Sequence, residues 1–277
     1  MNKHYEKDMA EQYNQYYQSG LYKTRYPSAN PNVLSFIHTQ LSLLPINPKS
    51  QVLDFGCGQG RYLLALANTY NLHFIGYDIS ERAISDLEEL LLLNHNTNNK
   101  IHLFCKKQKL KNYLEDSKPI SLSLMMFGVL SHITQASERV KVLKENKAQL
   151  ASQEGAILLS VPNRSRRFLF KQAWNIVKNI SLKNSESIQY QRKGKIKLNY
   201  HLYTLSSLKQ ELALAGLEAI ISQAESMLPE KWVLSHPLLA KLDKVLCHLL
   251  PIQFAYGFLV LAKPKLKNRT QQNKEVR

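Results

Sequence analysis

Short apolar runs alternate with longer stretches of helical periodicity along most of the chain. Alternation of this kind is typical of a mainly parallel sheet whose faces are covered by helices. The apolar runs therefore predict an α/β fold built on a seven-stranded sheet with helices on both faces. The predicted strands span residues 51–55, 73–77, 101–105, 121–127, 156–161, 217–222 and 257–262.

Helix signals fill the intervals between these runs. Ser80 is placed as the N-cap of a helix that continues to Leu92, and Gly216 closes a helix that starts near Leu205. The lysine-rich stretch between the third and fourth strands is predicted as a connection. Further helices are predicted over residues 60–70 and 136–150.

Length and composition favour one folded unit with additions. A chain of 277 residues that is 44% apolar can bury one substantial core and is too short to assume two domains. We predict a single domain over residues 1–265. Its additions are a helical N-terminal cap (1–48), a basic insertion after strand five (162–199) and a helical lid insertion between strands six and seven (224–256). Residues 266–277 are expected to be a disordered tail.

The positive charge is unevenly distributed. The formal net charge is +16, and the segment from Arg164 to Lys197 holds ten basic residues against the single acid Glu186. Such a concentration favours a polyanionic partner, either a nucleic acid or an anionic membrane surface. A basic loop that merely keeps the protein soluble explains the composition equally well.

Other classes of protein are disfavoured by the sequence. The three cysteines stand far apart, so neither a disulfide framework nor a metal site is expected. The N-terminal stretch is polar and lacks the apolar core of a signal peptide, which predicts a cytoplasmic protein. Residues 245–262 carry no formal charge, but polar residues and Pro251 interrupt them, so no transmembrane segment is predicted.

The sharpest chemical signal is a glycine-rich loop at the end of the first predicted strand. Gly56, Gly58 and Gly60 let the backbone turn tightly and approach a ligand closely. Arg61 stands where a dinucleotide-binding GxGxxG loop would place glycine. This spacing favours S-adenosylmethionine over NAD, as does Asp54, whose carboxylate could accept a hydrogen bond from the ammonium group of the methionine moiety.

A second acid supports the same cofactor. Asp78 follows the second strand, 18 residues after Gly60, where a carboxylate can accept both ribose hydroxyls. Ile79 is placed to pack on the adenine ring. After the fourth strand, Val129 and Leu130 are expected beside the reactive sulfonium.

His132 is the titratable residue nearest the place where donor and acceptor should meet, so it is the candidate catalytic residue. A lone histidine is more often structural, and no clear constellation of bases surrounds it in the sequence. An acceptor that is already nucleophilic, such as a carboxylate, needs no general base. The sequence weakly favours an acceptor of that kind.

The stretch Val52-Leu53-Asp54-Phe55-Gly56-Cys57-Gly58-Gln59-Gly60, followed by the acid of strand two, resembles the class I S-adenosylmethionine-dependent methyltransferases. The resemblance implies a Rossmann-like sheet of seven strands with the last strand antiparallel. Phe104, Cys105 and Lys106 stand where that family contacts adenine, often through an acid, which is missing here. The implied cofactor-binding residues are Asp54, Gly56, Cys57, Gly58, Gly60, Asp78, Ile79 and Val129.

Several further stretches partly resemble the tRNA wobble-uridine methyltransferases that esterify 5-carboxymethyluridine. They are an Arg-Tyr-Pro stretch near the N-terminus, arginines after strand five and a Tyr-His-Leu-Tyr block. The resemblance implies a tRNA acceptor, a carboxylate ester as product, and leaves room for a small partner protein. The implied substrate-binding residues are Arg25, Tyr26, Arg61, Arg164, Arg166, Arg167, Tyr200, His201 and Tyr203.

Three alternatives remain open. Apolar residues from Trp232 to Leu249 recur at helical spacing beside lysines, and such a helix could lie on an anionic membrane and present a lipid or quinone acceptor. A small metabolite is the second alternative, with Tyr13, Tyr16 and Tyr17 of an N-terminal helix closing over the donor. A non-catalytic module that only binds S-adenosylmethionine is the third.

Overall fold

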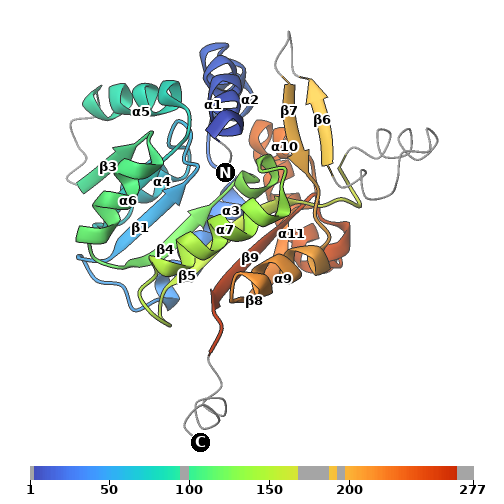
Figure 1. The fold of residues 1–277 in the computed structure, drawn as a ribbon. Helices are drawn as coiled ribbons and strands as arrows, with labels where there is room; N and C mark the ends of the chain where they lie inside the picture. The colour runs from blue at the N-terminus through green and yellow to red at the C-terminus, as the bar shows by residue number, and fades with distance from the viewer. Residues whose placement is uncertain (1–2, 94–99, 168–186, 192–196, 267–277) are drawn as a thin grey trace, which may run out of the picture.

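The computed structural model describes residues 3–93, 100–167, 187–191 and 197–266. A seven-stranded sheet forms the centre of the molecule (Figure 1). Its strands are β1 (Gln51–Phe55), β2 (His73–Tyr77), β3 (Lys100–Phe104), β4 (Ile120–Met125), β5 (Ala156–Pro162), β8 (Leu217–Ser226) and β9 (Gly257–Pro264). They lie in the order β3-β2-β1-β4-β5-β9-β8, and β9 runs antiparallel to both of its neighbours. The predicted mixed sheet is therefore confirmed.

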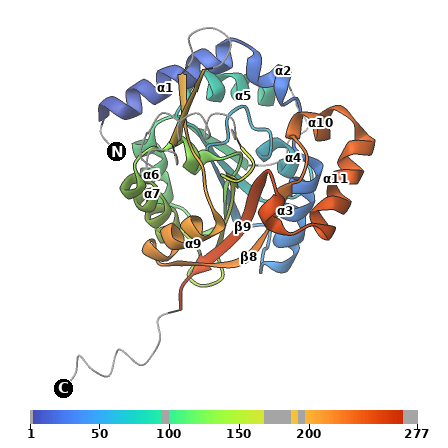
Figure 2. The same ribbon diagram turned by 90° about the vertical axis from the view of Figure 1, so that its right-hand side faces the viewer.

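Helices cover both faces of this sheet, as Figures 1 and 2 show. Because successive strand residues point to opposite faces, Leu53 lies in one hydrophobic core and Val52 in the other. The first core is closed by α6 (Lys107–Asp116), α7 (Ala136–Ala148) and α9 (Leu205–Leu214). The second is closed by α3 (Pro31–Leu43), α4 (Leu63–Ala67) and α5 (Glu81–Leu93).

Some elements differ from those predicted. The helix expected from residue 60 begins only at Leu63, because Gly60 has a φ of +79° that no helical residue adopts. The lysine-rich connection contains α6, whose buried Leu110 and Leu114 are one helical turn apart. Strand β8 continues to Ser226, so the helical insertion starts later than residue 224.

The basic segment after β5 is described only in part. Its residues 168–186 and 192–196, like the tail from 267 onward, lie outside the described residues. Within the described part, β6 (Ser187–Gln191) and β7 (Lys197–His201) form an antiparallel hairpin that the sequence pattern did not predict. Strand pairing between short polar segments leaves little periodic signal, which explains the omission.

Further helices lie above one end of the strands and beside the outer edge of the sheet. The long helix α1 (Lys3–Gln18) and the short α2 (Leu21–Arg25) lie above the carboxyl ends of the parallel strands. Asn14 joins α1 to α5, because its Oδ1 accepts hydrogen bonds from the Ser80 hydroxyl and the Arg82 N–H. The insertion before β9 forms α10 (Glu230–Ser235), α11 (Pro237–Leu249) and the turn η3 (Ile252–Phe254) at the outer edge. Among the described helices, none is long and apolar enough to cross a bilayer.

Candidate active site

The glycine loop adopts the conformation that its composition requires. Gly56, Gly58 and Gly60 have φ values of +85°, +54° and +79°, in the left-handed region that side chains disfavour. The loop is bonded to the end of β2, because the Gly56 N–H donates to the carbonyl of Tyr77 (2.6 Å) and the Gly58 N–H donates to Oδ2 of Asp78 (2.8 Å). The loop and the second acid thus form one unit.

Two neighbouring elements enclose this loop. A Cβ on Gly56 would lie 2.4 Å from Cγ2 of Val129, and one on Gly58 would lie 2.5 Å from the hydroxyl oxygen of Tyr17. Val129 belongs to the short helix η1 (Val129–His132), and Tyr17 belongs to α1. The Cys57 side chain is instead part of the second hydrophobic core, so only its backbone belongs to the loop surface.

Two buried carboxylates lie beside the loop. Asp54 and Asp78 are 3% and 6% exposed, and neither forms an ion pair with a side chain in the described part of the chain. Burial and, to a smaller extent, the nearby Asp78 raise the pKa of Asp54 to about 7. Burial also raises the pKa of Asp78 to about 6, although the N–H groups of Ser80 and Gly58 oppose this. Buried carboxylates of this kind are stabilised by a cation and by hydroxyl donors, which are the groups that S-adenosylmethionine offers.

One pocket lies between the glycine loop and the end of β4. Asp78, Ile79 and Gly56 line it together with Phe127 and His132, whereas Asp54 is not among its lining residues. An adjoining groove is lined by Ile79, Cys105 and Lys106 on the sheet side and by residues of α1, where the adenine contact was predicted. Aromatic side chains of α1 and α2 cover the pocket: Tyr13, Tyr16, Tyr17 and Tyr22.

Of the two covers that the sequence suggested, the tyrosines of the N-terminal helix line the pocket and the helical insertion does not. No described residue of 224–256 lines the pocket or the groove. The helical insertion packs instead on β8 and α3. Helix α1 therefore covers the pocket, and the helical insertion does not lie in the lid position that the sequence predicted for it.

His132 lines the pocket and is half-buried between two aromatic rings. Its ring centre is 5.3 Å from that of Tyr13 and 4.9 Å from that of Tyr200. Its Nδ1 is 3.2 Å from the carbonyl oxygen of Asn199. A proton on Nδ1 satisfies this carbonyl and makes Nε2 the accepting nitrogen of the neutral ring.

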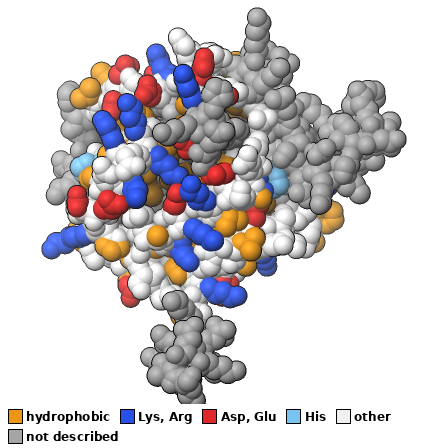
Figure 3. Space-filling view, viewed as in Figure 1, with side chains coloured by type: hydrophobic (Ala, Val, Ile, Leu, Met, Phe, Trp, Pro, Cys, Tyr) orange, Lys and Arg blue, Asp and Glu red, His pale blue; other side chains and the backbone are white. Residues whose placement is uncertain are grey.

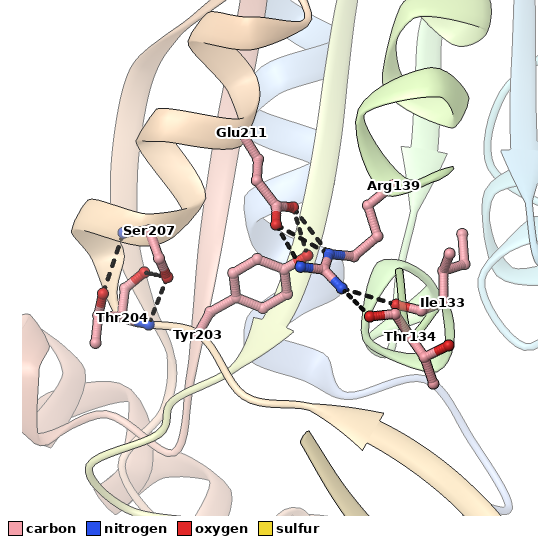
Figure 4. Close-up of polar contacts among 7 residues, drawn as sticks. All are labelled: Ile133, Thr134, Arg139, Tyr203, Thr204, Ser207 and Glu211. Atoms are coloured by element: carbon pink, nitrogen blue, oxygen red, sulfur yellow. Dashed lines mark hydrogen bonds and ion pairs between the residues drawn. The ribbon is translucent and has the colours of Figure 1, made fainter. Parts of the chain in front are cut away.

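A buried ion pair supports the segment that carries His132 (Figure 4). The Arg139 Nε lies 3.0 Å from both carboxylate oxygens of Glu211. The Nη1 of the same arginine donates to the carbonyls of Ile133 (3.0 Å) and Thr134 (2.9 Å), directly after His132. The hydroxyl of Tyr203 donates to Glu211 as well. This arrangement joins the loop after η1 to helix α9. It could not be predicted from the sequence, because the partners are 72 residues apart.

The Tyr-His-Leu-Tyr block was predicted to contact the acceptor, but it lies in the interior. Tyr200, His201 and Tyr203 are 9%, 4% and 0% exposed. The hydroxyl of Tyr203 donates a hydrogen bond to Glu211, and His201 packs edge-on against the Tyr203 ring. His201 and Tyr203 line neither the pocket nor the groove, whereas Tyr200 contacts His132 and lies against Gly128, beside the pocket residues Phe127 and Val129.

Arg61 and Tyr26 were also predicted to bind substrate, and they too are buried. The Arg61 side chain is 5% exposed and forms a 2.6 Å ion pair with Glu230. Its guanidinium lies over the rings of Phe127 (4.6 Å) and Tyr62 (4.8 Å). Tyr26 packs against Phe127, with ring centres 4.5 Å apart. Arg61 and Tyr26 thus act as supports behind the pocket wall.

The other predicted arginines are arranged differently. Arg25 is exposed beside the Tyr26 ring, and Arg166 is exposed too. Arg164 is half-buried, and Arg167 donates from Nε to the carbonyl of Tyr256 (3.1 Å) while lying over that ring. The structure does not gather these arginines at the pocket, because none of them lines it. On the face seen in Figure 3, basic and acidic side chains are interspersed.

Comparison with known proteins decides the family. The profile of a family described as "Methyltransferase domain" matches residues 31–223, which is more than half of the chain and includes the glycine loop and both buried acids. The chain belongs to this methyltransferase family. It is an S-adenosylmethionine-dependent methyltransferase, and S-adenosylmethionine is its cofactor. A search of curated proteins finds no significant match.

Solved structures show the same fold at low sequence identity. A methyltransferase from Methanosarcina mazei aligns with a TM-score of 0.59 at 18% identity, covering 87% of this chain and all of its own. The 1,6-didemethyltoxoflavin-N1-methyltransferase of Burkholderia thailandensis gives 0.56 at 15% identity, covering 94% and 90%. A putative methyltransferase of Haloferax volcanii, solved with the activator Trm112, gives 0.55 at 12%, covering 94% and 99%. Within the described residues, this methyltransferase has no cluster of side chains suited to a metal ion.

Proposed function

We propose that the donor lies along the pocket from the groove beside Cys105 to Val129. In this arrangement Asp54 attracts the ammonium of the methionine moiety, Asp78 accepts from the ribose hydroxyls, and Ile79 packs on adenine. Support comes from the two buried carboxylates without ion-pair partners in the described chain and from the glycine backbone that both Val129 and Tyr17 approach. The bound donor supplies a methyl group on a cationic sulfonium.

The acceptor that this pocket fits best is a small molecule with an apolar or aromatic body. The observation that carries this proposal is the aromatic wall at the acceptor end, where Tyr13, Tyr22 and Phe127 line the same pocket as Asp78. A flat, apolar acceptor would be held between these rings by stacking and by exclusion of water. One fold neighbour of this size acts on 1,6-didemethyltoxoflavin, which is a small molecule.

His132 is the residue that we propose to act on the acceptor. A neutral ring whose Nδ1 proton is held by the Asn199 carbonyl can use Nε2 to take a proton from a hydroxyl or amine. Methyl transfer to such a group needs removal of that proton, whereas transfer to a carboxylate does not. The presence of His132 at the acceptor end therefore favours a protic acceptor over the carboxylate that the sequence suggested.

The tRNA wobble uridine is the weaker candidate. Its support is the charge of the basic segment, most of which lies outside the described residues. Against it stands the burial of Tyr26, His201 and Tyr203, which the resemblance had placed on the substrate. A small partner protein and a cytoplasmic location stay proposals. The first has the Trm112 complex of a fold neighbour in its favour, and the second rests on the sequence alone.

A transfer assay tests this proposal. The protein is given tritiated S-adenosylmethionine together with a metabolite pool, total small RNA or a lipid extract, each in a separate reaction. We expect label in the metabolite fraction. Label in RNA that is released by mild alkali would overturn the small-molecule proposal and support a carboxylate ester on tRNA.

Variants of two histidines test the proposed base. His132→Ala should reduce transfer about 100-fold or more while donor affinity stays within about twofold, since general-base catalysis contributes 10²–10⁴-fold. His102→Ala is the matched control, because His102 is exposed on β3 and lines neither cavity. Equal transfer rates for the two variants would remove His132 from the reaction.

A further inference from the structure

Helix α11 and its flanks expose an unusual amount of apolar surface. Of the thirteen large hydrophobic side chains that are exposed in the described chain, seven lie within residues 232–254. Their exposed fractions range from 42% to 79%, and single exposed hydrophobic residues need no explanation whereas clusters of them mark contact surfaces. We call these seven side chains the docking face: Trp232, Leu238, Leu242, Val245, Leu249, Leu250 and Phe254.

Four side chains of the docking face lie on the same side of helix α11. Leu238, Leu242, Val245 and Leu249 are separated by four, three and four residues, so they form a single stripe along α11. The sequence pattern did not separate the apolar residues between Trp232 and Leu249 from one another, but Leu239 and Leu246 are half-buried whereas the stripe is exposed. The structure therefore separates a packed inner side from an apolar outer one.

A buried acid holds α11 in this orientation. Asp243 is fully buried, and its Oδ1 accepts from the N–H groups of Met227 and Leu228, each at 2.8 Å. Its Oδ2 accepts from the side-chain amide of Asn32 on α3, also at 2.8 Å. Turning the apolar stripe inward would break all three hydrogen bonds, so the stripe stays outside.

Within residues 230–256 the exposed lysine and acidic side chains have one sign. Residues 230–256 contain two acids, and both are used internally: Glu230 pairs with Arg61, and Asp243 is buried. The exposed charged residues that remain are Lys231, Lys241 and Lys244. An apolar stripe whose own segment exposes three lysines and no acid is complementary to an anionic surface that also offers an apolar layer.

We propose that the docking face binds an anionic lipid bilayer, with α11 lying in the plane of the interface. Its 13 residues are too few to cross the bilayer, for which about 20 are needed. In the bound state the leucine stripe enters the acyl boundary and the lysines contact lipid headgroups. Figure 2 shows α10 and α11 together at the outer edge of the molecule, where a flat surface can reach both. This proposal is independent of the acceptor, because no described residue of the docking face lines the pocket.

Vesicle flotation with the full chain tests the proposal. Vesicles of phosphatidylcholine alone are compared with vesicles that also contain phosphatidylglycerol, and we expect binding to the second kind that weakens as salt is raised. The double variant Lys241→Gln/Lys244→Gln should bind about 25-fold more weakly, at about fivefold for each lysine. Leu242→Glu should weaken binding about tenfold or more.

Matched changes on another helix serve as controls. Leu214 and Lys209 are exposed on α9, and Leu214→Glu/Lys209→Gln should leave vesicle binding unchanged. Donor affinity, measured by calorimetry, confirms that every variant is folded. Equal binding of the wild type, the α11 variants and the α9 variant would overturn the proposal, and so would equal binding to neutral and anionic vesicles. A dimer in light scattering that Leu242→Glu dissociates would also overturn it, since a second copy would then cover the face.

Discussion

Donor affinity should fall steeply when the pH is lowered, because two buried carboxylates must be charged to hold the donor. The pKa of Asp54 is about 7 and that of Asp78 about 6 in the protein without donor. At about pH 6 the charged fraction of Asp54 is roughly one in eleven and that of Asp78 about one half. The apparent affinity scales with the product of these fractions, so it should drop about 20-fold between about pH 8 and about pH 6.

Calorimetry with S-adenosylhomocysteine or S-adenosylmethionine at a series of pH values measures this change. In Asp54→Asn the affinity at about pH 8 should already be reduced, and the remaining pH dependence should shrink to about twofold, which is the share of Asp78. An affinity that is constant between these pH values would refute the assignment of the two acids. A 20-fold dependence that survives in Asp54→Asn would refute the role of Asp54 in particular.

Stability without donor should change in the opposite direction. Because the folded-state pKa of Asp54 lies above its ordinary value of 3.8, the contribution of this group to stability is greatest at low pH and is lost as the pH rises through about 7. Lowering the pH from about 8 to about 6 should therefore add roughly 1 kcal/mol from Asp54 to the free energy of unfolding. Thermal unfolding at both pH values separates this effect from a general loss of fold.

Two further substitutions probe the support of the site. Arg139→Met should lower the free energy of unfolding by about 3–5 kcal/mol in urea denaturation, because it leaves the Glu211 carboxylate buried without its cation. A loss below about 1 kcal/mol would mean that water or another group replaces the arginine. Gly56→Ala should weaken donor binding more than tenfold, since a Cβ there meets Val129 at 2.4 Å on a backbone with φ +85°. Gly20→Ala is the control, with a similar φ of +68° and nothing within 4 Å, and similar donor affinities for both variants would contradict the proposed close approach.

The sequence predicted well what depends on neighbouring residues. Strands β1 and β2 have the predicted limits, and Ser80 caps α5 as expected, with its hydroxyl accepting from the Ala83 N–H at 3.1 Å. The glycine loop could be recognised because its positive φ angles restrict the residue types locally. Helix α6 was missed, since its surface is so rich in lysine that only Leu110 and Leu114 carry the apolar signal.

Burial and pairing of the polar and aromatic residues were decided by the tertiary structure. Arg61 was predicted to face a substrate, but Glu230, 169 residues away, neutralises it behind the pocket wall. Tyr203 was predicted to bind the substrate, yet α9 covers it and Glu211 accepts a hydrogen bond from its hydroxyl. A periodic pattern shows that a side chain is apolar or charged, whereas its exposure depends on which distant segment packs against it. The sequence by itself thus determined the α/β sheet and the donor loop, and it offered the N-terminal helix as one of two covers for the pocket. Only the folded chain determined that the helical insertion lies away from the pocket and that one side of α11 stays uncovered.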